Sequence, residues 1–134
     1  MKIYEHINYL IRASHKAEME DLKLKEEIGL DPEMGLELFY PKAVEYCHAD
    51  RPERAKIEEY LEKLDDDVVL KLETLMYFGR DNDDFDNVKE YLANLNESKE
   101  DIIRTIVEKR GAYPVYFQRA IEKLREQGVD IKTL

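Results

Sequence analysis

The stretch Leu72-Glu-Thr-Leu-Met-Tyr-Phe-Gly-Arg80 decides how this sequence folds. Its apolar residues Leu72, Leu75 and Met76 recur at the spacing of one face of an amphipathic helix. A glycine and an arginine follow directly, and residues 81–86 form a dense acidic turn with the sequence Asp-Asn-Asp-Asp-Phe-Asp. The segment therefore predicts a helix that packs into the core and ends at a charged junction.

The rest of the chain shows further helical patterns bounded by capping residues. A first apolar stripe starts at Lys2 and can extend to Glu27. Pro52 and Pro114 stand where proline is favoured, in the first turn of a helix, and Ser98 stands where an N-cap is expected. No run alternates apolar and polar residues over the length of a strand. We therefore expect an all-α fold, a single compact bundle of about six or seven short helices spanning residues 1–134.

Residues 30–49 are the least regular part of the pattern. Pro41 interrupts it, and the residue before a proline is biased away from helical geometry. We therefore expect two short helices, at 32–40 and 42–49. The segment has enough apolar side chains to dock on the core: Leu36, Leu38, Phe39, Tyr40, Val44 and Tyr46. Residues 1–49 either share this core or form a separate N-terminal helical subregion.

Composition and charge exclude several classes of protein. The chain has 31 acidic and 21 basic residues, a formal net charge of −10 that repels nucleic-acid backbones and anionic membranes. No apolar run approaches the roughly 18 residues of a membrane span, and the N-terminus lacks a signal-peptide pattern. Cys47 is the only cysteine, so no internal disulfide can form. We expect a cytoplasmic protein that binds neither nucleic acid directly nor a membrane. Its partner is expected to be a protein with a basic surface, or a second copy in a homodimer.

The segment that contains Leu72, Leu75, Met76, Tyr77, Gly79 and Arg80 resembles a bacterial family of unknown function with the signature L-x-x-L-M-x-x-G-R. The resemblance covers about residues 66–132. This chain has Tyr77 where the family often has tryptophan, and Asp81-Asn82 where the family has Gly-Asp. The resemblance implies a helical fold and no known activity, so it assigns no catalytic residue.

The junction at the end of this helix supplies the candidate interaction residues Arg80, Tyr77, Asp81, Asp83 and Asp84. An arginine at a helix end can offer its planar guanidinium to a carboxylate or a phosphate. The alternative is structural: Gly79 lets the chain leave the helix, and Arg80 pairs with the neighbouring acids or with the last helix carbonyls.

Patterns for catalysis and metal binding are weak. Glu45 and His48 have the E-x-x-H spacing of di-iron bundles, but such sites need two of these motifs and the chain has one. The acidic turn fails the EF-hand template, which requires a glycine at position 6 and a glutamate at position 12. Cys47 and His48 are adjacent and point about 100° apart on a helix. We predict no catalytic residue, no metal and no cofactor.

These observations favour a non-enzymatic module for protein–protein interaction or regulation. One alternative is an acidic inhibitor that mimics nucleic acid towards a DNA-handling enzyme, with Asp65–Asp67 and Asp81–Asp86 as its negative stripes. The other is a small helical enzyme that uses Glu45, His48 and Arg80.

Overall fold

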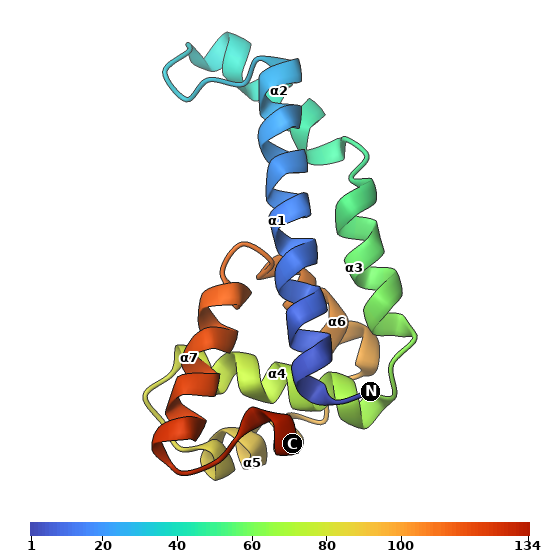
Figure 1. Ribbon diagram of the computed structural model, residues 1–134. Helices are drawn as coiled ribbons and strands as arrows, with labels where there is room; N and C mark the ends of the chain where they lie inside the picture. Colours follow the sequence, from blue (N-terminus) through green and yellow to red (C-terminus); the bar gives the residue numbers. More distant parts are fainter.

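The computed structural model describes residues 1–134 and contains helices but no strand, which confirms the predicted all-α bundle. No helix combines the length and the apolarity needed to cross a bilayer. The chain forms α1 (Ile3–Ile28), α2 (Leu36–His48), α3 (Pro52–Glu62), α4 (Asp66–Arg80), α5 (Phe85–Leu95), α6 (Lys99–Glu108), α7 (Tyr113–Glu126) and the 3₁₀ turn η1 (Ile131–Thr133). In Figure 1, α1 and α3 run side by side, α4 to α7 gather around their lower ends, and α2 lies at the upper end.

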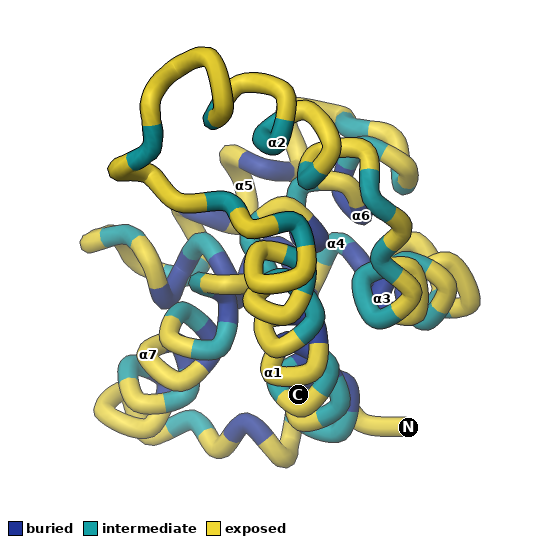
Figure 2. The backbone as a smooth tube through the Cα atoms, turned by 90° about the horizontal axis from the view of Figure 1, so that it is seen from above, coloured by how far each residue is buried: buried dark blue, intermediate teal, exposed yellow.

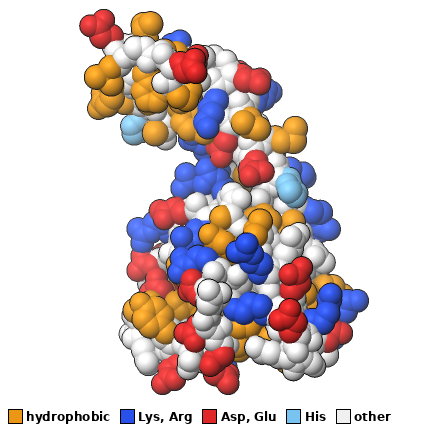
Figure 3. All heavy atoms as spheres, turned by 90° about the vertical axis from the view of Figure 1, so that its left-hand side faces the viewer, with side chains coloured by type: hydrophobic (Ala, Val, Ile, Leu, Met, Phe, Trp, Pro, Cys, Tyr) orange, Lys and Arg blue, Asp and Glu red, His pale blue; other side chains and the backbone are white.

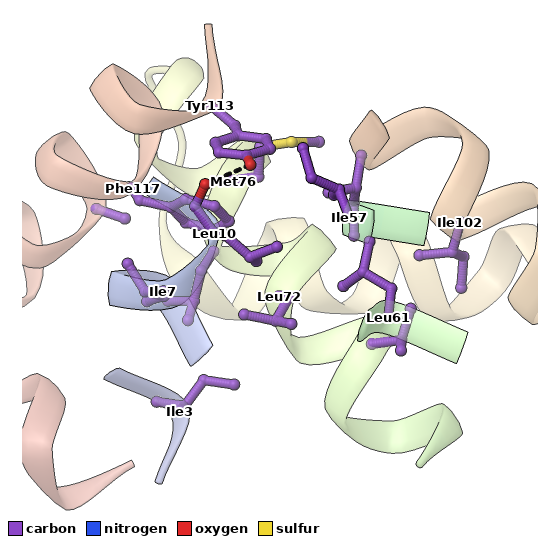
Figure 4. Packing of buried hydrophobic residues seen from close by; sticks show 14 of the residues in the cluster. Ile3, Ile7, Leu10, Ile57, Leu61, Leu72, Met76, Ile102, Tyr113 and Phe117 are labelled. Atoms are coloured by element: carbon purple, nitrogen blue, oxygen red, sulfur yellow. Dashed lines mark hydrogen bonds between the residues drawn. The ribbon is translucent and has the colours of Figure 1, made fainter. Parts of the chain in front are cut away.

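Helix α4 is the centre of the core. It packs most closely on α7 and also contacts α1, α5 and α6. Leu72, Leu75 and Met76, the apolar residues of the deciding stretch, are all fully buried. Figure 4 shows Leu72 and Met76 among side chains from α1, α3, α6 and α7. The Tyr113 hydroxyl of α7 donates a hydrogen bond to the Leu10 carbonyl of α1 in this core. A polar group buried there needs such a partner.

Gly79 lies within α4 and does not end it, so the predicted role of this residue is wrong. The helix continues to Arg80, and a Cβ atom added at Gly79 would lie 1.7 Å from the Tyr116 carbonyl oxygen of α7. Gly79 therefore allows the backbones of α4 and α7 to approach each other closely. The glycine serves helix packing because any larger residue would collide with backbone atoms.

Residues 29–49, which we call the arm, do not dock on the core as predicted. No residue of α2 is buried, and the arm contains no dark blue segment in Figure 2. The arm extends from the end of α1, whose last buried residue is Ala17. We call the remaining helices, with the N-terminal part of α1, the body. The apolar residues of the arm had suggested docking, but the long helix α1 carries them beyond the reach of the core.

The prediction of two helices around Pro41 is also wrong, because a single α2 runs through this proline. Proline removes one backbone donor from the helix and disfavours helical geometry in the residue before it. The helix continues on both sides of Pro41, so the local bias at Tyr40 is overcome. The start of α1 and its end at Gly29, which has a left-handed φ of 74°, agree with the sequence pattern.

Candidate functional site

A cleft of about 280 Å³ lies between α4 and α5, beside the deciding stretch. Four of the predicted interaction residues line it: Tyr77, Arg80, Asp81 and Asp83. The fifth, Asp84, is instead the N-cap of α5 and accepts a hydrogen bond from the Asn87 backbone N–H at 2.8 Å. The other lining residues are Val88, Tyr91, Leu92, Leu95 and Glu97. The cleft therefore combines an apolar wall from α5 with charged groups at its ends.

Arg80 is already engaged within the protein. Its Nε and one terminal nitrogen donate to the two carboxylate oxygens of Asp81 at 2.8 and 3.2 Å. Its guanidinium also lies 4.4 Å from the ring centre of Tyr77. The hydrogen bonds to Asp81 raise the pKa of Arg80, and burial raises the pKa of Tyr77. An incoming anion would have to compete with Asp81, so Arg80 is a poor anion site.

The acidic turn is held by Lys123 of α7, which the sequence analysis did not single out. The Lys123 ammonium group donates to the carbonyl oxygens of Phe78, Asp81 and Asp83 at 2.7, 2.8 and 3.2 Å. Cations favour the negative end of a helix, and this lysine reaches the carbonyls at the end of α4. Hydrogen bonds from Asn87 and the Asp84 backbone lower the pKa of Asp83. The turn is therefore largely a structural feature.

Glu73 is the main residue that the sequence analysis missed. It is completely buried in α4, and neither of its carboxylate oxygens has a hydrogen-bond partner. Burial, followed by the neighbouring Glu97, raises its pKa from 4.5 to about 7. A negative charge on Glu97 disfavours a second negative charge on Glu73, which adds to the effect of burial. The available signal was the position of a glutamate between Leu72 and Leu75 in an apolar helix.

The arm exposes an apolar stripe along α2. Leu36, Tyr40, Val44 and Cys47 follow each other at spacings of four, four and three residues, which places them on one face of a helix. Leu36, Tyr40 and Val44 are 77%, 66% and 41% exposed, and Cys47 is also exposed. In Figure 3, hydrophobic side chains gather over this end of the molecule. We call these four residues the α2 stripe.

Polar contacts hold the arm to the body through Arg51. This side chain is only 9% exposed and donates to Asp21 of α1 at 2.9 Å. It also donates to the Tyr46 and Ala49 carbonyl oxygens at 2.7 and 3.1 Å. Its guanidinium lies 4.6 Å from the Tyr46 ring centre. Arg51 therefore joins the end of α2 to α1, and Lys25 of α1, whose ammonium group lies 5.7 Å from the Tyr46 ring centre, adds a second contact between the two helices.

The residues of the alternative enzyme prediction do not come together. Glu45 and His48 lie on α2 in the arm, whereas Arg80 is paired with Asp81 at the end of α4 in the body. No group of three His, Cys, Asp or Glu side chains is arranged so that it could hold a metal ion. The acidic stretches Asp65–Asp67 and Asp81–Asp86 flank opposite ends of α4, about 20 Å apart along a helix of this length.

No family model matches this chain, and no curated protein or solved structure matches it. The resemblance of residues 66–132 to a family of unknown function stays a prediction.

Proposed function

We propose that this protein is a non-enzymatic interaction module that binds another protein through the α2 stripe. The observation that carries this proposal is a helix with a continuous apolar face and no buried residue. An amphipathic helix normally buries such a face, and helices of this kind bind in apolar grooves of other proteins. The proposed partner is a protein with an apolar groove bordered by basic residues.

The size of the stripe supports this proposal. At about 200 Å² for a large side chain, the exposed fractions of Leu36, Tyr40 and Val44 correspond to on the order of 400 Å². Contiguous apolar patches of a few hundred Å² often mark interaction sites. The net charge of −10 favours encounter with a basic partner. Helix α2 itself carries only three charged residues, Glu37, Lys42 and Glu45. Few charged side chains therefore stand between its apolar face and a partner.

The test is affinity purification from the native host with three single variants of equal charge change. Leu36→Glu and Tyr40→Glu place a carboxylate on the α2 stripe, where both side chains are exposed and folding should be unaffected. Val115→Glu is the matched control, because Val115 is 49% exposed on α7 in the body. A partner retained by the wild type and the control but lost by both stripe variants supports the proposal.

Sedimentation equilibrium on the same variants detects a second copy as the partner. Self-association that both stripe variants abolish, and Val115→Glu leaves intact, would identify the protein itself as the binding protein. The proposal is overturned if partners bind the stripe variants as well as they bind the wild type. It is also overturned if the wild type shows neither a partner nor self-association.

A further inference from the structure

Asp21 on α1 is shared between two arginines that are distant in sequence. One of its carboxylate oxygens accepts a hydrogen bond from Nε of Arg51 at 2.9 Å, and the other accepts from Nη2 of Arg110 at 3.1 Å. None of the three side chains is more than 23% exposed. A guanidinium and a carboxylate often pair through two parallel hydrogen bonds, and neither arginine has that pairing with Asp21.

The two arginines tie Asp21 to different parts of the molecule. Arg51 donates to two carbonyl oxygens at the end of the arm. Arg110 lies in the turn between α6 and α7, where its Nη1 donates to the Val107 carbonyl oxygen at 3.2 Å. The carbonyl oxygen of Arg110 also accepts from the buried Ser14 hydroxyl at 2.7 Å. Asp21 is therefore held to the arm by Arg51 and to the body by Arg110.

Arg110 has one donor that is not used. Its Nε is buried and has no hydrogen-bond partner, which is unfavourable for a charged group. Nε and Nη2 lie on the same side of the guanidinium, and their N–H groups point in the same direction. Nη2 already contacts Asp21. If the bond to Arg51 breaks, a rotation of the Asp21 carboxyl group can place both of its oxygens on this side of Arg110 and satisfy Nε.

The boundaries of the arm fit such a movement. At one end, α1 stops at Gly29. At the other end, the Glu20 carboxylate accepts from the backbone N–H groups of Glu53 and Arg54 at 2.8 and 3.3 Å, which holds the first turn of α3 on α1. Residues 29–51 can therefore detach while α3 stays in place. Detachment exposes no buried residue of α2, because α2 has none.

We propose that Asp21 is a latch with two positions. In the first position, which the structure shows, Asp21 holds the arm through Arg51. In the second position the arm is detached, and Asp21 pairs through both oxygens with Arg110. The new hydrogen bond to Nε compensates part of the contacts that the arm loses. The latch is independent of the proposed function, because it requires no partner at the α2 stripe.

NMR of the Arg110 Nε–H group in the full chain detects the second position. Arg51→Met removes the guanidinium that competes for Asp21, so the Arg110 Nε–H should gain an acceptor. Its proton resonance should move downfield, and its exchange with water should slow about tenfold. Arg54→Met is the matched control, because Arg54 makes its ion pair with Glu58 on α3. This control should leave the Arg110 signal unchanged.

Amide hydrogen exchange in the arm tests the latch from the other side. Arg110→Lys keeps the charge and can still bond one Asp21 oxygen, but it lacks the two parallel N–H groups that the second position needs. Detachment then becomes less favourable, so exchange in residues 36–48 should slow about threefold or more. These amides report detachment because α2, with 13 residues and a proline, is too short to stay helical by itself. If Arg110 only supported Asp21, the same variant would speed up exchange.

A double variant checks that both effects pass through Asp21. In an Asp21→Asn background, Arg110→Lys should have no effect on exchange in residues 36–48. The proposal is overturned if Arg51→Met does not change the Arg110 Nε–H signal, or if Arg110→Lys leaves exchange in the arm unchanged or makes it faster. Exchange in α4 shows whether a variant disturbs the body, and the Arg51→Met result decides the proposal if Arg110→Lys does so. None of these results bears on the α2 stripe, which Leu36→Glu tests separately.

Discussion

The body and the arm are built from the same kind of helix and are held in place by different forces. In the body, α4 buries residues on nearly every side, and four other helices (α1, α3, α6 and α7) and the 3₁₀ turn contribute side chains to one apolar cluster. In the arm, α2 buries none, and Arg51 joins its end to α1 through hydrogen bonds. Two segments with comparable apolar content can therefore have opposite roles. One is buried in the core, and the other leaves its apolar face exposed.

The largest expected contrast comes from removing one leucine in each region. Leu72→Ala deletes a fully buried side chain, and the lost burial plus the cavity should lower the free energy of unfolding by roughly 2–5 kcal/mol. Leu36→Ala deletes a side chain that is 77% exposed, so it should change the free energy of unfolding by less than about 0.5 kcal/mol. Urea denaturation measures both. Equal losses would mean that the arm is packed on the body in solution.

The next contrast uses two glycines. Gly79→Ala forces a Cβ atom against the Tyr116 carbonyl, so α4 and α7 must move apart. This overpacking should lower the free energy of unfolding by about 3 kcal/mol. Gly35→Ala in the arm has no atom within 4 Å of the added Cβ and should be nearly neutral. Thermal unfolding of the two variants makes the comparison. A stable Gly79→Ala protein would contradict the close approach of these helices.

Glu73 gives the body a pH dependence. Because folding raises its pKa from 4.5 to about 7, the folded state binds this proton more tightly than the unfolded state does. The glutamate therefore lowers stability as pH rises from below 4.5 to above 7, by up to about 3 kcal/mol.

Glu73→Gln removes this titration and should make the protein about 1–3 kcal/mol more stable than the wild type at pH 8, with a smaller difference at pH 4.5. Urea denaturation at the two pH values, with Glu90→Gln as the control, measures the effect. A constant difference across this range would show that Glu73 does not titrate there.

The smallest expected effect on global stability is that of Arg51→Ala, which tests the attachment of the arm. The variant loses the hydrogen bonds to Asp21, Tyr46 and Ala49, so amide hydrogen exchange in residues 36–48 should speed up about tenfold. Exchange in α4 should not change. Arg54→Ala, which removes only a longer ion pair to Glu58, is the control. Unchanged exchange in the arm would show that contacts other than those of Arg51 hold α2 in place.

Much of the secondary structure could be predicted because its signals are local. Apolar spacing, Pro52 at the start of α3, and the caps at Asp84 and Ser98 act within one or two helical turns. Pro41 misled the prediction for the same reason, since its local bias against the preceding helical residue was overcome in the folded chain. Tyr77, Arg80, Asp81 and Asp83 were singled out from one junction, and they also line one cleft.

The sequence by itself determined the helical class, the packing of the helix that contains Leu72, Leu75 and Met76 into the core, and the strongly acidic character of the chain. Composition and periodicity are properties of the chain alone. Only the tertiary structure decided that Gly79 packs against Tyr116, that Lys123 holds the acidic turn and that Glu73 lies buried beside Glu97. It also decided that α2 stays exposed. Each of these depends on which residues distant in sequence come within a few ångströms of one another, and periodicity along a helix carries no information about that.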